Sequence, residues 1–145
     1  MGKTELRELG PSVIAGSEGD EEIVAALGDG AGIPGDLVSI GSDRKIVLAD
    51  AGAVELLSGI LKESPITGTE TAIVAGVGCS VVIPKSGHRY RIRCLNLAAD
   101  KEIGFPLDVS ATAGKADAAA TMVASIFSIS RAYTNTDTVC EVRWN

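Results

Sequence analysis

The segment HRYRIRCL, residues 88–95, decides which fold class this sequence is expected to adopt. Its apolar residues, Tyr90, Ile92 and Cys94, alternate with arginines. Because successive side chains of a β-strand point to opposite faces, this alternation predicts a strand with one apolar face and one face of three arginines. The final segment, residues 139–144, follows the same alternation and is also predicted to be a strand.

Outward from this strand, the chain is a series of short apolar runs separated by turn residues. Further strands are predicted over residues 36–40, 45–49, 71–75, 80–83, 105–109, 115–117 and 121–130. Residues 54–61 suit either a strand or one helical turn. Residues 21–27 are predicted to form a short helix, because Ser17 to Asp20 is typical of a capping box and Gly28 would end it, although Ile23 and Val24 also suit a strand.

The composition favours a β-rich core. Hydrophobic residues make up 46% of the chain, which contains 17 glycines but only one tryptophan, two tyrosines and two phenylalanines. Small and β-branched side chains must therefore build the core, and they favour thin sheets with tight turns. We predict a mainly β fold, a small antiparallel β-barrel or sandwich with at most one or two short helices. Residues 1–16 are predicted to be an extended N-terminal arm, since Gly10-Pro11 interrupts regular structure, and residues 17–145 a single β-rich domain.

Charge is distributed unevenly along the chain. The net charge is −6, and residues 1–55 hold 11 of the 19 acidic residues but only 4 of the 13 basic residues. An acidic chain repels phosphate backbones, so nucleic acid is not expected as a partner. The longest apolar run, residues 72–83, is too short to span a bilayer, and no membrane partner is expected. The asymmetry favours contact between unlike surfaces, such as those of neighbouring copies.

Patterns typical of catalysis or metal binding are weak. His88 is the only histidine, and no ligand spacing typical of zinc or calcium sites occurs. A Cys79–His88 dyad would have to meet across a hairpin, whereas His88 follows a turn where an exposed polar residue is expected. Residues 30–35 match the dinucleotide-binding pattern, but that site needs a strand before it and a helix after it, the reverse of the order predicted here. No catalytic residue, cofactor, metal or small-molecule substrate is therefore expected, and the protein is predicted not to be an enzyme.

The three cysteines, Cys79, Cys94 and Cys140, contain no CxxC pair. Their odd number and spacing argue against a disulfide framework or a zinc site. Buried thiols are predicted at all three positions.

The arginine face of residues 88–95 is the main candidate for an interaction surface. Arg89, Arg91 and Arg93 would stand about 7 Å apart along the strand, where they need carboxylate partners or solvent. Such a face is typical either of a solvated surface with acidic cross-strand partners or of a docking stripe for an acidic protein surface. The candidate protein interface also includes apolar residues of the arm: Leu6, Leu9, Val13 and Ile14.

Several segments resemble the capsid decoration (head cement) proteins of tailed viruses of bacteria or archaea. They combine small-residue turns with short apolar runs, and they are residues 33–38, 59–60, 80–84, 104–107 and 112–115. The resemblance implies a homotrimeric β-domain with an N-terminal arm. It further implies a protein made in the host cytoplasm that binds the major capsid protein on the exterior of an icosahedral capsid and stabilises the virion. No catalytic residues carry over from that family.

Two alternatives stay open at this point. A small ligand-binding or enzymatic trimeric β-barrel would use His88 with the face of Arg89, Arg91 and Arg93. A tail-associated virion protein would have a similar composition.

Overall fold

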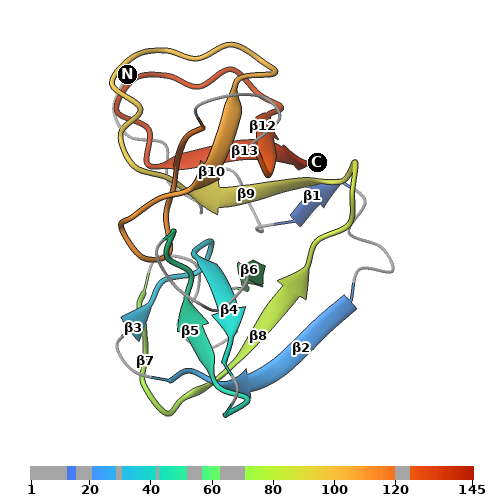
Figure 1. Ribbon diagram of the computed structural model, residues 1–145, viewed down its shortest axis with the longest axis vertical. Helices are drawn as coiled ribbons and strands as arrows, with labels where there is room; N and C mark the ends of the chain where they lie inside the picture. The colour runs from blue at the N-terminus through green and yellow to red at the C-terminus, as the bar shows by residue number, and fades with distance from the viewer. Residues whose placement is uncertain are drawn as a thin grey trace.

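The computed structural model describes residues 13–15, 21–28, 31–41, 43–51, 57–62, 71–119 and 125–145 of the 145-residue chain. All regular structure in these ranges is β-strand (Figure 1). The strands are β1 (Val13–Ala15), β2 (Glu21–Ala26), β3 (Ala31–Gly32), β4 (Leu37–Ile40), β5 (Ile46–Leu48), β6 (Leu57–Leu61), β7 (Ile73–Val74), β8 (Gly78–Ile83), β9 (Arg89–Arg93), β10 (Pro106–Val109), β11 (Ala116–Ala118), β12 (Phe127–Ile129) and β13 (Val139–Trp144).

A six-stranded sheet contains most of the C-terminal half of the chain. Its strand order is β1-β9-β13-β12-β10-β11, and all neighbouring strands are antiparallel. The sheet curls, because Cys94, just beyond β9, forms an isolated parallel bridge with Ala116 of the far strand β11. The sheet is therefore a nearly closed barrel, with β1 added along the first part of β9.

A five-stranded sheet lies below the first in the view of Figure 1. Its order is β2-β8-β6-β4-β5, again antiparallel throughout. Leu27, just beyond β2, forms a parallel bridge with Ile46 of β5, so this sheet also curls until its outer strands meet. Such closure satisfies backbone groups that open sheet edges would leave exposed. Strands β3 and β7 pair as a separate two-stranded sheet.

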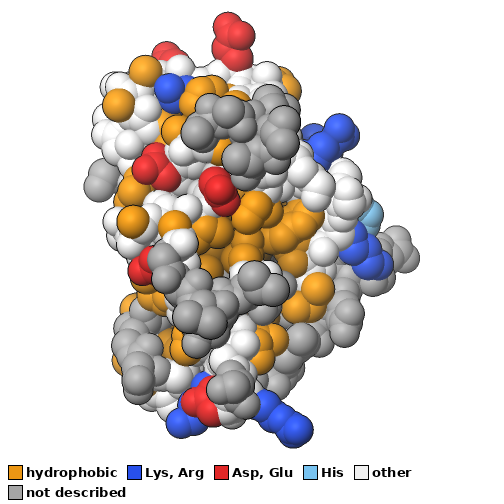
Figure 2. All heavy atoms as spheres, in the orientation of Figure 1, with side chains coloured by type: hydrophobic (Ala, Val, Ile, Leu, Met, Phe, Trp, Pro, Cys, Tyr) orange, Lys and Arg blue, Asp and Glu red, His pale blue; other side chains and the backbone are white. Residues whose placement is uncertain are grey.

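Two hydrophobic clusters fill these curled sheets. The larger is centred on the six-stranded sheet and includes the fully buried Tyr90, Ile92, Phe127 and Val142. The smaller belongs to the five-stranded sheet and includes Leu27, Ile46 and Val81. Figure 2 shows hydrophobic side chains reaching the surface in the middle of one face, between the upper and lower sheets.

Neighbouring residues of β4, β6 and β8 belong to different clusters. In each pair the first residue belongs to the larger cluster and the second to the smaller: Leu37 and Val38, Ile60 and Leu61, Val82 and Val81. Both faces of these strands are buried at these positions, which explains why apolar residues follow one another there without alternation. The packing is tight at Gly59 of β6, where a Cβ would lie 2.3 Å from the carbonyl oxygen of Val82.

An ion pair between a buried carboxylate and a partly exposed lysine connects the two sheets. Asp36, just before β4, is 1% exposed, and its carboxylate bonds to the ammonium group of Lys115, just before β11. The Asp36 carboxylate also accepts a hydrogen bond from the Ile33 N–H at 2.9 Å. The Leu37 N–H donates to the Gly114 carbonyl oxygen at 2.8 Å, which reinforces the junction. Burial raises the pKa of the Asp36 carboxyl, and the hydrogen bond and charge of Lys115 oppose that shift.

The predicted fold class is confirmed, since the described residues form two curled antiparallel sheets and no helix. The last strand, Val139–Trp144, has the predicted bounds, and β9 lies within the predicted residues 88–95. Strand β6 shows that residues 57–61 of the ambiguous segment are a strand. Strand β12 falls within the predicted residues 121–130, of which 121–124 lie outside the described residues.

The predicted helix over residues 21–27 is wrong. Glu21–Ala26 is strand β2, and it pairs with β8 from Glu21 opposite Ile83 to Ala26 opposite Gly78. The capping signal is local and weak, whereas pairing along the whole strand and the Leu27 bridge are long-range contacts. Tertiary pairing therefore outweighs local helix preference here.

Of the predicted arm, the structure describes only Val13–Ala15, which form β1. Val13 lies opposite Tyr90 and Ala15 opposite Arg89, so this segment is an edge strand of the six-stranded sheet. Leu6 and Leu9 lie outside the described residues, as do the side chains of Val13 and Ile14.

Candidate interaction surface

The outer face of the six-stranded sheet contains the predicted arginines. As the alternation of β9 requires, Tyr90 and Ile92 are fully buried. On the opposite face, Arg89 is exposed and Arg91 is half-buried. The prediction that arginines and apolar residues occupy opposite faces of this strand is thus confirmed.

Arg93 differs from the other two arginines because it is 7% exposed. Its Nε donates to the Pro34 carbonyl oxygen at 3.0 Å, and its backbone N–H donates to the Gly35 carbonyl oxygen at 2.9 Å. The turn before β4 therefore covers the end of β9. Arg93 connects the two sheets, and of the three predicted arginines the outer face exposes chiefly Arg89.

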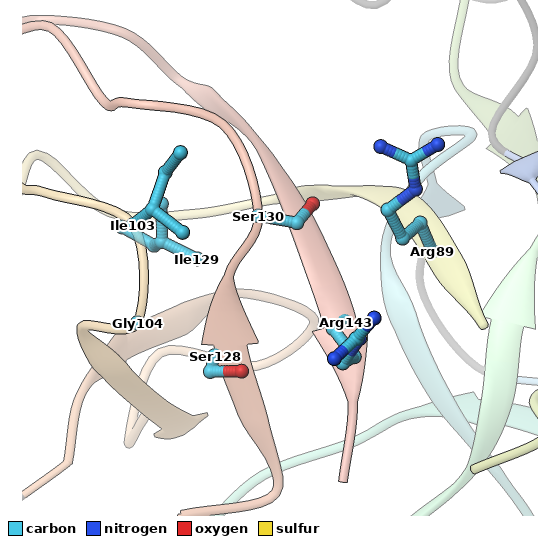
Figure 3. Close-up of a pocket in the computed structure, with 7 residues that line it drawn as sticks. All are labelled: Arg89, Ile103, Gly104, Ser128, Ile129, Ser130 and Arg143. Carbon is cyan, nitrogen blue, oxygen red and sulfur yellow. The ribbon is translucent and has the colours of Figure 1, made fainter. Parts of the chain in front are cut away.

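A shallow groove of about 320 Å³ lies beside Arg89. Arg143 of β13 stands opposite Arg89 in the strand register, and Ser128 of β12 stands opposite Arg143. The remaining lining residues come from the end of β12 and a nearby turn: Ile103, Gly104, Ile129 and Ser130. Figure 3 shows Ile103 and Ile129 on one side of the groove and the two arginines on the other. Because Ile129 is 1% exposed, the groove combines the apolar side chain of Ile103 with two arginines.

Ile103 is the most prominent apolar side chain of this surface, with 70% of it exposed. It lies in a turn in which the Phe105 N–H donates to the Glu102 carbonyl oxygen at 3.1 Å and Gly104 adopts a φ of 95°. The Gly104 N–H also donates to the carbonyl oxygen of Ile129 at 2.7 Å, which attaches the turn to β12. An exposed apolar side chain on an anchored turn can insert into a partner with little loss of conformational entropy.

The electrostatics of the face are mainly basic. Glu141 of β13 lies 3.8 Å from the Arg89 guanidinium, and its carboxylate accepts a hydrogen bond from the Ser130 hydroxyl at 3.4 Å. Burial lowers the pKa of Arg91, as does the positive charge of Arg131, while the charge of Glu141 acts in the opposite direction. Along β9, β13 and the chain after β12, the described arginines therefore outnumber the single glutamate.

The same sheet has an acidic end at β10 and β11. Asp108 and Asp117 stand opposite each other in the register. They point outward, because their neighbours Leu107 and Ala116 are fully buried. Each carboxylate accepts a hydrogen bond from the next backbone N–H in its own strand. Like charges directly opposite each other destabilise a sheet, and this sheet has one acidic pair and one basic pair, Arg89 with Arg143.

Residues considered for catalysis are not brought together. Cys79 is at the start of β8 and buried in the smaller cluster, whereas His88 follows the turn after the other end of β8. The four residues of β8 that follow Cys79 carry the chain roughly 13 Å away before the turn that leads to His88. The part of the chain that the structure describes contains no group of three or more potential metal ligands. It also contains no helix long and apolar enough to cross a membrane.

The dinucleotide-like string is in the wrong structural context for that ligand. Gly30 lies outside the described residues, Ala31–Gly32 is strand β3, and the next element is strand β4. A dinucleotide site requires a helix whose N-terminus faces the pyrophosphate, and a strand occupies that place.

Sequence reasoning missed four residues of this surface: Ile103, Asp108, Asp117 and Arg143. Alternation indicates that Arg143 shares a face with Glu141, but only the register places it beside Arg89. The pairing of Asp108 with Asp117 follows from the hairpin of β10 and β11, whose turn at residues 112–114 was visible in the sequence. Nothing in the sequence marks Ile103 as exposed.

No protein-family model and no curated protein sequence matches this chain. Among solved structures, the capsid of Myoviridae Phage XM1 contains a chain with a similar structure. The match covers 100% of this chain and 89% of that chain, with a TM-score of 0.52 and 18% sequence identity. At this level of identity the comparison establishes a shared fold: this chain folds like a chain of a phage capsid.

Proposed function

We propose that this protein is a structural virion component that binds the exterior of an icosahedral capsid as a homotrimer and stabilises it. The fold shared with a chain of the XM1 phage capsid, over the full length of this chain, is the observation that carries the proposal. The major capsid protein is the proposed partner, and the protein has no catalytic role in this proposal.

The candidate surface supports binding to protein. An exposed Ile103 beside two arginines and two serines offers an apolar anchor with a polar rim, the arrangement found at protein–protein interfaces. The groove is partly open to solvent, whereas pockets for small ligands enclose most of the ligand surface. The separation of Cys79 from His88 likewise favours a binding role over the enzymatic alternative.

The charge distribution of the six-stranded sheet supports self-association. The Arg89–Arg143 pair of one copy would neutralise the Asp108–Asp117 pair of the next, and each contact would relieve two like-charge repulsions. The contact joins two different patches, and we propose the head-to-tail arrangement, in which each copy uses its basic pair toward one neighbour and its acidic pair toward the other. Head-to-tail contacts between identical subunits generate closed rings where the rotation between neighbours closes, and a trimer is the ring proposed here.

The capsid contact is assigned to the N-terminal arm, with Leu6, Leu9, Val13 and Ile14 as its apolar residues. Three arms in one trimer would multiply a weak single contact through avidity. Removal of residues 1–12, which precede β1, should therefore weaken capsid binding and leave the trimer intact.

The self-association is tested by charge exchange. The variant R89E/R143E should be monomeric in light scattering, and so should D108K/D117K, because each places like charges across the contact. The combination of all four changes restores opposite charges and should restore the trimer. R44E/K45E, which makes the same change of charge on an exposed turn of the five-stranded sheet, is the control and should remain trimeric. Trimers in both double variants would refute this contact.

The capsid function is tested by co-sedimentation with undecorated shells of the cognate virus. Binding in a fixed ratio to the major capsid protein, together with a higher melting temperature of the shells, is expected. A protein that never sediments with shells, but does so with purified tails, would establish the tail-associated alternative instead.

A further inference from the structure

Two of the three thiols lie in direct contact. Cys94 follows β9 and Cys140 lies in the adjacent strand β13, and both are buried, at 4% and 3% exposure. The Cys140 thiol donates to the Cys94 sulfur, with the two Sγ atoms 2.7 Å apart. Non-bonded heavy atoms normally approach to about 3.5–4.0 Å, and bonded sulfurs to about 2.05 Å. The two side chains are therefore already pointed at each other along the line that a covalent bond would take.

The surrounding backbone holds this arrangement in place. Cys140 lies opposite Ile92, and the Cys94 N–H donates to the Thr138 carbonyl oxygen at 3.0 Å, so the two cysteines occupy diagonal positions of one strand pair. Cys94 is also tied to Ala116 by the bridge that closes the six-stranded sheet. Diagonal positions of an antiparallel pair lie about 7–8 Å apart between Cα atoms, slightly beyond the usual disulfide range. Closing the bond therefore requires the two strands to move slightly closer at this point, with no change of strand register.

We infer that Cys94 and Cys140 are a disulfide-forming site, oxidised by a low-molecular-weight disulfide once the protein leaves a reducing compartment. One cysteine thiolate attacks the small disulfide, forming a mixed disulfide and releasing one small thiol. The second cysteine then attacks the protein sulfur of that mixed disulfide and releases the second small thiol. Two protein thiols and one small disulfide thus become one protein disulfide and two small thiols, which balances atoms and electrons.

The reaction is slow in the native protein. Both sulfurs are shielded from solvent, so an oxidant reaches them only when the sheet opens locally. The hydrogen bond to Cys94 and burial also raise the pKa of Cys140, which keeps that thiol protonated at neutral pH. The site is therefore reduced during synthesis and oxidised gradually afterwards, which suits a crosslink acquired after folding.

Cys79 provides an internal control. It is buried in the smaller cluster of the five-stranded sheet, whereas Cys94 and Cys140 belong to the larger cluster. The structure therefore brings Cys94 and Cys140 together and keeps Cys79 in a different cluster. The odd number of cysteines gave no indication of this pairing. This inference does not depend on the proposed virion role.

The test uses the full-length reduced protein, incubated with oxidised glutathione at neutral pH, with and without mild urea to promote local opening. After acid quenching, the protein is denatured, alkylated and mapped by peptide mass spectrometry. A peptide linking Cys94 to Cys140, with Cys79 fully alkylated, is the expected result. The melting temperature should rise on the order of 10 °C on oxidation and fall again with a reductant.

Two variants separate this bond from general effects of oxidation. C79S should keep both the linkage and the gain in melting temperature, whereas C140S should lose both and accumulate glutathione on Cys94. Full alkylation of both cysteines after oxidation in urea, a stable mixed disulfide in the wild-type chain, or a linkage through Cys79 would each overturn the inference. Because the peptide map of the wild-type chain is decisive alone, the test holds even where C140S does not fold.

Discussion

Replacement of Lys115 by methionine tests the buried ion pair that joins the two sheets. The change keeps most of the side-chain volume but leaves the Asp36 carboxylate, 1% exposed, without its ammonium partner. Breaking a fully buried pair from one side costs about 3–5 kcal/mol, and the lower end of that range applies here, because the Lys115 side chain is 26% exposed and Arg93 still acts on the Asp36 charge. For a chain of this size the melting temperature should fall by roughly 10 °C at neutral pH.

The pH dependence makes this prediction specific. A carboxyl whose pKa is raised in the folded state binds its proton more tightly when folded than when unfolded. The stability that protonated Asp36 contributes is therefore fully present below the pKa that this carboxyl has in the unfolded chain. It is lost as the pH rises through the pKa that the carboxyl has in the folded protein. Without Lys115, which opposes that rise, the pKa of Asp36 should be higher still. The defect of K115M should thus be small in acid and grow toward neutral pH.

The assay is urea unfolding at pH 4 and pH 7, followed by the fluorescence of Trp144, whose ring packs edge-on against Phe127 at 4.7 Å. The double variant D36N/K115M removes the buried charge and should recover most of the lost stability at neutral pH. K45M, at an exposed lysine, is the matched control and should change little. A K115M cost below about 1 kcal/mol that is equal at both pH values would refute the reasoning.

Three further predictions follow from the packing and the surface. G59A should destabilise the fold by about 1–3 kcal/mol in urea unfolding, because its Cβ would lie 2.3 Å from the Val82 carbonyl oxygen. G78A is the control and should be nearly neutral, since a Cβ at Gly78 meets nothing within 4 Å. Equal effects of the two changes on the free energy of unfolding would contradict this packing. Ultraviolet titration should show one phenol ionising near pH 12, since burial raises the pKa of Tyr133 to about 12, and Y133F should remove that step. I103S should leave the melting temperature unchanged but weaken trimer association about tenfold or more in dilution experiments. V74S, at an exposed valine outside the groove, should leave trimer association unchanged. Equal trimer association in the two variants would show that Ile103 is not part of the interface.

Some features followed from local chemistry alone. The alternation in residues 88–95 and 139–144 determined two strands and which residues face the core, and the structure buries Tyr90, Ile92 and Val142 accordingly. The scarcity of aromatic residues and the abundance of turn residues indicated a mainly β chain. The cysteines were correctly expected to be buried. These inferences hold because a strand's side-chain period and a turn's backbone requirements are encoded within a few neighbouring residues.

Other features required partners distant in the sequence. Glu21–Ala26 has a helix-start signal but becomes a strand because β8 is available to pair with it. Arg93 has the same local pattern as Arg89, yet a turn some 59 positions away covers it. The contact between Cys94 and Cys140, and the two like-charge pairs of the six-stranded sheet, exist only once the strand order is set. Local sequence determines which way a side chain points, whereas the order and curvature of the sheets determine what it meets, because those depend on the summed energy of long-range contacts.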